Sequence, residues 1–174
     1  MSDNLRERTF QWEDPMPGAK EAMTMAGLDY FQAMNDGKLP FPPLLNTLDF
    51  KVESIEKGKA VFTFKPQEFH YNPIGTVHGG VISAILDSAM GCSIHSLLPA
   101  GTGYTTLELK VNFLKAITIK SGELRAVGKV IHSGSRTALV EAQLVDHNNT
   151  IYAHGVSTCM IMNLGTKENT DKLI

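Results

Sequence analysis

The 174-residue chain has few cysteines, no surplus of positive charge and no long apolar run. Its two cysteines, Cys92 and Cys159, are far apart in the sequence, which is typical of neither a disulfide framework nor a zinc site and fits a reducing compartment. The formal net charge of −2 argues against a nucleic-acid-binding domain. The most apolar run, residues 81–90, is far below the roughly 20 residues that span a bilayer. We therefore expect a soluble, cytoplasmic protein with no nucleic-acid or membrane partner and no signal peptide.

Several catalytic and cofactor motifs are also missing. The sequence has no Gly-x-Ser-x-Gly elbow of a serine hydrolase, no phosphate-binding loop and no dinucleotide-binding fingerprint. The histidines outside position 78, His70 among them, show no metal-ligand spacing, so we interpret them as incidental. We therefore expect neither a metal ion nor a separate cofactor.

The hydrophobic pattern divides the chain into three parts. Residues 1–44 contain a polar arm, a helical pattern over 19–36 that Gly37 ends, and a proline-rich linker over 39–43. Residues 45–163 carry the remaining strand and helix signals and form the main domain. Residues 164–174 are a polar tail.

The main domain has the pattern of an α+β fold. Strand patterns over 48–55 and 60–64 flank a turn, and a helix pattern follows from Gly79 to about Leu98. This helix is apolar on nearly every side, so it must be covered almost all round. Four more strand patterns, over 104–114, 122–132, 136–146 and 151–162, are joined by short turns that indicate antiparallel neighbours. The order predicts an antiparallel sheet wrapped around one central helix.

Asp87 is the only acidic residue of this apolar helix from Val81 to Leu98, where no lysine or arginine occurs. A carboxylate in such surroundings costs free energy unless it is paired, hydrogen-bonded or protonated, and it suits a general base. The alternative is that Asp87 lies on a narrow polar stripe with Ser83 and Gly91 and only solubilises the helix.

The helix begins at His78-Gly79-Gly80. Two glycines at the first helical positions leave N–H groups bare at the positive end of the helix dipole, where an oxyanion can bind. The alternative is a plain helix start. Gly79 and Asp87 are separated by about 12 Å along the axis, too far to act on one carbonyl group. Two copies related by a two-fold axis could supply both groups to each site, which predicts a homodimer with two equivalent sites.

The string Asn72-Pro73-Ile74-Gly75-Thr76-Val77-His78-Gly79-Gly80, followed by Asp87, resembles the hotdog-fold acyl-CoA thioesterases. It is most similar to the phenylacetate-degradation and 4-hydroxybenzoyl-CoA thioesterase type, and the resemblance covers residues 45–162. It implies the hotdog fold, a homodimer or a dimer of dimers, and hydrolysis of an acyl-CoA thioester to a free acid and coenzyme A. Coenzyme A is then part of the substrate rather than a cofactor.

The resemblance also implies roles for individual residues. Asp87 matches the carboxylate that activates water or attacks the thioester directly. The Gly79 N–H matches the group that polarises the thioester carbonyl, with His78 beside it, and Asn72 matches a side chain that orients substrate or water.

Members of the family place a hydroxyl residue near the start of the third strand, where Thr105 and Thr106 are both available. Strand alternation puts Thr105 on the face of Leu107 and Leu109, toward the helix, so we expect Thr105 to be the catalytic hydroxyl.

Coenzyme A is implied to bind at the turn between the fourth and fifth strands. A glycine turn with two serines and an arginine offers N–H groups, hydroxyls and a bidentate phosphate partner, although it could also be a simple polar hairpin. The residues expected to contact substrate or coenzyme A are Gly80, Thr106, Val130, His132, Ser133, Gly134, Ser135, Arg136 and Thr137.

Two other functions stay open at this stage. A hotdog hydratase or dehydratase would carry a histidine paired with an acid in a different arrangement. A non-catalytic acyl-CoA sensor would need an output element, and the short N-terminal helix is the only surplus segment. The acyl group, the tetramer arrangement and the choice between base and nucleophile for Asp87 are not determined by the sequence.

Overall fold

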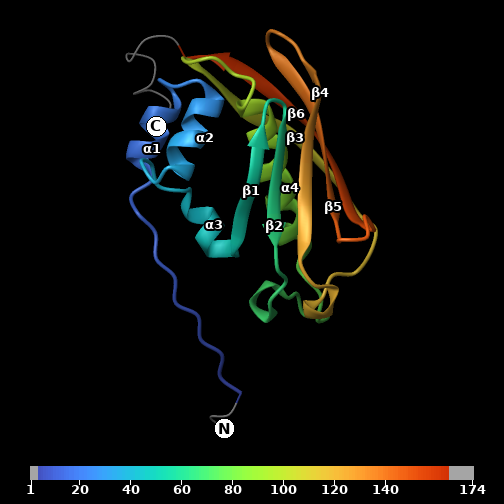
Figure 1. The fold of residues 1–174 in the computed structure, drawn as a ribbon. Coiled ribbons are helices and arrows are strands. Elements are labelled where there is room, and N and C mark those ends of the chain that lie inside the picture. Colours follow the sequence, from blue (N-terminus) through green and yellow to red (C-terminus); the bar gives the residue numbers. More distant parts are fainter. Residues whose placement is uncertain (1–3, 165–174) are drawn as a thin grey trace.

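The helix α4 (Gly79–His95) lies inside a strongly curved antiparallel sheet, as Figure 1 shows. The computed structural model describes residues 4–164. The six strands are paired in the order β1-β2-β4-β5-β6-β3. Their bounds are β1 (Phe50–Glu56), β2 (Lys59–Phe64), β3 (Thr102–Phe113), β4 (Leu124–Ser133), β5 (Thr137–Val145) and β6 (Ile151–Asn163). The expected α+β hotdog architecture is confirmed.

One strand pairing differs from expectation. The sequence pattern suggested that the first two of the last four strands are neighbours, but β4 pairs with β2 and β5, whereas β3 pairs with β6. The connection between β3 and β4 contains the short 3₁₀ helix η2 (Ile119–Ser121) and carries the chain to the other side of α4. Consequently β3 is an edge strand, and one of its two sides has no strand partner among residues 4–164.

Burial of one face of α4 holds the helix in the sheet. Ile85, Leu86, Ala89 and Met90 on this face are fully buried against the strands. β4 approaches the helix so closely at Gly128 that a Cβ atom there would lie 2.3 Å from the Ala89 carbonyl oxygen. A glycine is therefore required at this crossing.

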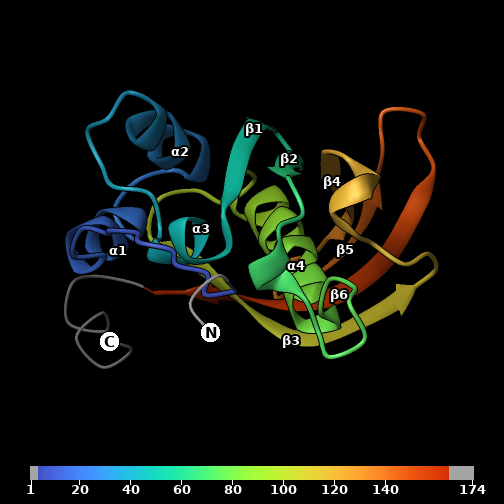
Figure 2. The same ribbon diagram turned by 90° about the horizontal axis from the view of Figure 1, so that it is seen from below.

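The opposite side of α4 is less covered than the sequence suggested. Figure 2 shows the sheet surrounding the helix on three sides, with the N-terminal helices along part of the fourth. Val81, Ala84, Asp87 and Ser88 are only partly buried. The expectation of cover almost all round was wrong for this stripe, because β1 and β3, the two edges of the sheet, do not meet.

The N-terminal region forms three helices instead of one: α1 (Met16–Ala22), α2 (Gly27–Asn35) and α3 (Pro43–Leu48). The expected helix over 19–36 is broken because Gly27 packs directly on the last turn of α4, where its N–H donates a hydrogen bond to the Leu98 carbonyl (3.0 Å). The expected linker ends earlier, since Pro43 occupies the first helical turn, where a proline N–H is not needed. Gly37 ends α2 with a positive φ of 71°, as predicted.

The last described residue contributes to the fold. Leu164 is buried and its N–H bonds to the Gly101 carbonyl, so it belongs to the fold, whereas the predicted polar tail beyond it is outside the described residues. No helix within residues 4–164 is long and apolar enough to cross a membrane.

Candidate active site

Asp87 lies midway along α4 on the partly exposed stripe, and its carboxylate is held by one hydrogen bond. The Thr106 hydroxyl on β3 donates to Asp87 Oδ1 at 3.0 Å. Within residues 4–164, no hydrogen bond reaches the other carboxylate oxygen. Asp87 is therefore oriented by a neighbour and keeps one oxygen free, as a base or nucleophile requires.

The hydroxyl that contacts Asp87 belongs to Thr106 and not to Thr105. Thr105 is exposed, so the expectation that it faces the helix was wrong. The cause is a β-bulge between Thr106 and Glu108, where the pairing with β6 shifts by one residue. Leu107 is the extra residue and is 57% exposed. Before the bulge, the even-numbered residues of β3 face α4, and after it the odd-numbered Leu109 does. Strict alternation counted back from Leu109 therefore places Thr105, rather than Thr106, on the side of the helix.

The start of α4 presents one free N–H group. The imidazole of His78 caps the helix, because Nδ1 accepts a hydrogen bond from the Gly80 N–H at 2.8 Å. The Gly79 N–H has no hydrogen bond within the described part of the chain. Of the two glycines, Gly79 thus has the donor that is open to a ligand, while that of Gly80 is already used.

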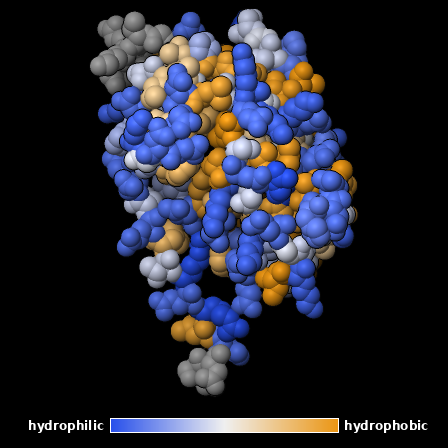
Figure 3. Space-filling model, in the orientation of Figure 1, coloured by the Kyte–Doolittle hydropathy of each residue, from blue (hydrophilic) through white to orange (hydrophobic). Residues whose placement is uncertain are grey.

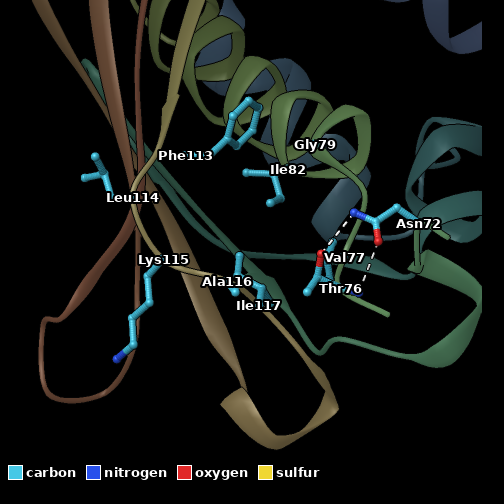
Figure 4. A pocket seen from close by; sticks show the side chains of 10 residues that line it. All are labelled: Asn72, Thr76, Val77, Gly79, Ile82, Phe113, Leu114, Lys115, Ala116 and Ile117. Carbon is cyan, nitrogen blue, oxygen red and sulfur yellow. Dashed lines mark hydrogen bonds between the residues drawn. The ribbon is translucent and has the colours of Figure 1, made fainter. Parts of the chain in front are cut away.

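A cavity of about 320 Å³ lies beside Gly79. Figure 4 shows its walls, formed by the start of α4 on one side and by the segment that follows β3 on the other. The Phe113 ring packs on Gly79, where an added Cβ atom would lie 3.1 Å from the ring. The Lys115 side chain also lines this cavity and lies over the Tyr152 ring. The cavity therefore combines a free N–H donor, apolar walls and one cationic group.

Asn72 lines the same cavity but uses most of its side chain to shape the loop before α4. Its Oδ1 accepts hydrogen bonds from the N–H groups of Ile74 (3.1 Å) and Thr76 (3.2 Å), and its Nδ2 donates to the Thr76 hydroxyl (2.9 Å). The bonds to Thr76 are drawn in Figure 4. One Nδ2 hydrogen is left for a ligand, so Asn72 can position the loop and contact substrate.

His70 was interpreted from the sequence as incidental, but it fixes this loop to the rest of the fold. Its Nδ1 accepts from the Gln67 N–H (3.0 Å), and its Nε2 bonds to the Leu48 carbonyl (2.9 Å). Its own carbonyl accepts the N–H of His78 (2.8 Å), immediately before Gly79. Burial lowers the pKa of the His70 imidazole, which keeps it neutral. Only three-dimensional contacts could identify this role, because His70 belongs to no recognisable motif.

The turn expected to bind coenzyme A joins β4 to β5. It is closed by a hydrogen bond from the Gly134 N–H to the Thr137 carbonyl (2.9 Å). His132, Ser133, Ser135, Arg136 and Thr137 are exposed, Gly134 is partly buried, and Val130 packs near the β1–β2 turn at Gly58. Figure 1 shows this hairpin at the opposite end of the sheet from the short helices η1 (Glu68–His70) and η2, which lie near the start of α4. Within one chain, the turn is therefore remote from Gly79.

Gly79 and Asp87 also remain apart within one chain, because α4 is continuous between them and each residue adds about 1.5 Å. No group of three or more histidine, cysteine or acidic side chains within residues 4–164 could hold a metal ion. Asp87 offers a carboxylate, and the Gly79 N–H offers a backbone hydrogen-bond donor for an oxyanion.

Comparison with known proteins decides the family. Residues 74–153, which include α4 and the strands from β3 to the start of β6, match the model of the thioesterase superfamily. A Saccharolobus solfataricus protein that carries the name of an esterase, SSO2140, is 31% identical over 115 residues, which span 66% of this chain and 80% of that protein. The chain belongs to the thioesterase superfamily.

Two further proteins support the same family and fold. A 1,4-dihydroxy-2-naphthoyl-CoA hydrolase of Listeria monocytogenes is 27% identical to this thioesterase, over an alignment that covers 68% of this chain and 93% of that protein. The solved structure of a phenylacetic acid degradation-related protein of Ralstonia eutropha JMP134 is 26% identical, with a TM-score of 0.69 over 75% of this chain and 98% of that one. These similarities confirm a hotdog-fold thioester hydrolase. The helices α1, α2 and α3 precede the residues that match the family model.

Proposed function

We propose that this thioesterase hydrolyses an acyl-CoA thioester to a free acid and coenzyme A, in sites that two copies of the chain share. The observation that carries the proposal is that α4 holds a carboxylate and an oxyanion donor too far apart to act on the same carbonyl group. Asp87 has a free carboxylate oxygen, and the free N–H of Gly79 lies about 12 Å away on the same rigid helix. A related coenzyme A thioester hydrolase supports the substrate class.

The surface around β3 suits the pairing that such a shared site needs. β3 is twelve residues long and its outer edge has no strand partner within residues 4–164. Leu107, Phe113 and Leu114 are 57%, 55% and 61% exposed along and just beyond this strand. An apolar, unpaired edge strand is covered in most natural proteins. Antiparallel pairing of two β3 strands about a two-fold axis would cover it and place the α4 stripes of both copies side by side.

In this arrangement the thioester carbonyl oxygen accepts a hydrogen bond from the Gly79 N–H of one copy, at the positive end of its helix dipole. Asp87 of the other copy takes a proton from a water molecule, whose oxygen attacks the carbonyl carbon. Collapse of the tetrahedral intermediate breaks the carbon–sulfur bond, and the departing coenzyme A thiolate takes up a proton. Direct attack by an Asp87 oxygen would instead form an acyl–enzyme anhydride as the carbon–sulfur bond breaks and the coenzyme A thiolate leaves. Water would then hydrolyse the anhydride to the free acid and the Asp87 carboxylate.

Thr106 keeps one Asp87 oxygen occupied so that the other points to the substrate, and His78 holds the start of α4 in shape. Asn72 orients the substrate through its remaining amide hydrogen. The turn with Ser133, Gly134 and Ser135, together with Arg136, binds the phosphate groups of coenzyme A. In the dimer, this turn of one copy comes to the end at which Gly79 of the other copy lies.

Two variants that each inactivate one half of the site test the shared arrangement. Asp87→Asn removes the carboxylate, and Gly79→Pro removes the N–H donor at a helix position that tolerates proline. Gly79→Ala, which adds a Cβ atom but keeps the N–H, is the matched control. We expect each inactive variant alone to lose at least about 100-fold in kcat, measured as released thiol from a panel of acyl-CoA substrates.

Mixed dimers of the two variants contain one intact site. In that site the unchanged Gly79 of the Asp87→Asn chain faces the unchanged Asp87 of the Gly79→Pro chain. Random exchange of subunits should therefore restore about a quarter of the wild-type activity. Undiminished hydrolysis by folded Asp87→Asn refutes the catalytic assignment. Inactive mixtures in which dimer exchange is demonstrated refute the sharing. Tight acyl-CoA binding without turnover in the wild type would point to a sensor instead.

A further inference from the structure

A second cavity, of about 250 Å³, lies between the N-terminal helices and the open side of the sheet. Phe31 and Met34 of α2 and Leu45 of α3 form one wall, and Val52 and Ile55 of β1 form another. Figure 3 shows hydrophobic residues gathered at the centre of this face, in the region between α2 and β1. The N-terminal helices thus close a space that the sheet alone leaves open.

The remaining wall comes from the elements that carry the candidate catalytic groups. Cys92 and His95 of α4 and Tyr104 of β3 line the cavity. Cys92 follows Asp87 by five residues, or about 7.5 Å along the helix. Tyr104 lies two residues before Thr106, on the same face of β3, and Tyr104 and Cys92 are both close enough to Asp87 for its charge to affect them. The cavity therefore begins about one and a half helical turns beyond Asp87.

The polar groups in this wall are held in their neutral forms. Burial lowers the pKa of the His95 imidazole and raises the pKa of the Tyr104 hydroxyl well above its usual value. It also raises the pKa of the Cys92 thiol to about 12. The His95 ring packs against Tyr104 and Phe31, at centroid distances of 5.8 and 5.3 Å. An uncharged, largely aromatic wall favours an apolar occupant and disfavours a charged one.

We propose that this cavity binds the acyl group of the thioester, and that the N-terminal helices set the greatest length that the enzyme accepts. The inference rests on the proposed function and deepens it, because it names the substrate class. The occupant is an uncharged straight-chain or single-ring acyl group. An engineered cavity of about 150 Å³ holds benzene, so 250 Å³ at similar packing holds about ten carbon atoms.

Its direction along α4 fits the reaction geometry. With the thioester carbonyl carbon beside Asp87, the acyl chain runs toward Cys92 and His95, and the coenzyme A moiety leaves on the other side. Phe31 and Met34 of α2 precede residue 45, where the resemblance to the family begins, whereas Leu45, Val52 and Ile55 lie within it. Acyl-chain length is thus selected in part by α2, an element that precedes the resemblance.

A matched pair of neighbouring substitutions on α3 tests the cavity. Leu45 lines it and is 8% exposed, whereas Leu44 does not line it and is 44% exposed. Leu45→Phe should shorten the preferred chain by about two to four carbons, and Leu44→Phe should leave the profile unchanged. Ile55→Ala, which enlarges the cavity from the partly buried β1 side, should extend the profile to longer chains. Circular dichroism and thermal melting establish that each variant is folded.

The readout is kcat/KM for acyl-CoA thioesters from two to twenty carbons. About six carbons span the roughly 7.5 Å from Asp87 to Cys92 and about ten fill the cavity. For the wild type we therefore expect a maximum at about fourteen to sixteen carbons and a fall of at least about tenfold by twenty. Octanoyl-CoA should exceed suberyl-CoA, which has the same length and a terminal carboxylate, by about 100-fold or more. A flat length profile, equal rates for these two substrates, or a shift caused by Leu44→Phe as large as that caused by Leu45→Phe would overturn the proposal.

A binding measurement separates this inference from the proposed function. Calorimetric titration with free carboxylic acids of about four to eighteen carbons requires no turnover. Asp87→Asn is the appropriate background, because it removes the charge that would repel the acid. If no acyl-CoA is hydrolysed but acid binding peaks near fourteen to sixteen carbons and shifts with Leu45→Phe, the cavity assignment stands and the proposed hydrolysis fails. Acid binding that is absent or independent of length overturns the cavity assignment even when acyl-CoA is hydrolysed.

Discussion

The hydrogen bond from Thr106 to Asp87 allows a sharp test, because two adjacent threonines differ only in the face of β3 that they occupy. Thr106→Val removes the hydroxyl and keeps the shape of the side chain. A hydrogen bond to a charged group contributes about 1.5–3 kcal/mol, and each 1.4 kcal/mol corresponds to a tenfold change in rate. If the bond orients Asp87 in the transition state, kcat should fall about 10- to 100-fold.

The KM of Thr106→Val should change little, because the hydroxyl orients a catalytic group and does not bind coenzyme A. Thr105→Val is the matched control. Its side chain is exposed, so we expect kcat within about twofold of wild type. Thr106→Ser, which keeps the donor, should recover most of the lost activity. The assay is initial-rate thiol release at saturating acyl-CoA, with thermal melting to exclude unfolding.

Loss of activity in Thr105→Val with none in Thr106→Val would refute the assignment and restore the alternation expected from sequence. Equal and small effects in both variants would show that Asp87 needs no orienting donor. In either case the bulge at Leu107 would have no catalytic consequence.

Three further predictions concern stability and reactivity. Burial lowers the pKa values of His70 and His95, so below about pH 6.5 the unfolded chain binds more protons than the folded chain. The stability contributed by the two neutral imidazoles is complete above that pH and is lost as the pH falls. The melting temperature should therefore decrease from about pH 6.5 to about pH 5, and it should decrease less steeply in His70→Gln. Gly27→Ala would place a Cβ atom 1.8 Å from the His95 carbonyl oxygen, so α2 must move away from α4. This displacement should lower the melting temperature by about 4–8 °C. An unchanged melting curve would show that α2 is not anchored at Gly27. Burial raises the pKa of the Cys92 thiol to about 12, so little reactive thiolate forms at pH 8 in the native protein. Iodoacetamide should therefore alkylate Cys92 at least about 100-fold more slowly in native than in unfolded protein. Mass spectrometry of the peptide that contains Cys92 measures both rates.

The sequence predicted the architecture because its strongest signals are local and periodic. The apolar helix, the alternating strands and the short turns each specify one element, and the motif around His78 and Asp87 identified the family. The string before Gly79 therefore predicted the family correctly, and the catalytic roles of Gly79 and Asp87 stay predictions.

The rest depended on contacts between distant residues. The bulge at Leu107 reverses the face of β3 on which each hydroxyl lies, and no local pattern marks it. The break before Gly27 arises from packing on α4, which helix periodicity does not report. The edge position of β3 depends on the path of the whole chain. The anchoring role of His70 appears only when the Leu48 carbonyl is brought beside it.

The continuity of α4 has a mechanical consequence for an enzyme with two shared sites. Gly79 and Asp87 are joined by an unbroken rod of hydrogen-bonded backbone, so neither can shift along the axis alone. In the proposed dimer, a slide of one helix moves an oxyanion donor in one site and a carboxylate in the other by the same amount. A substrate that shifts one helix by binding in the first site would thereby change the position of a catalytic group in the second, empty site.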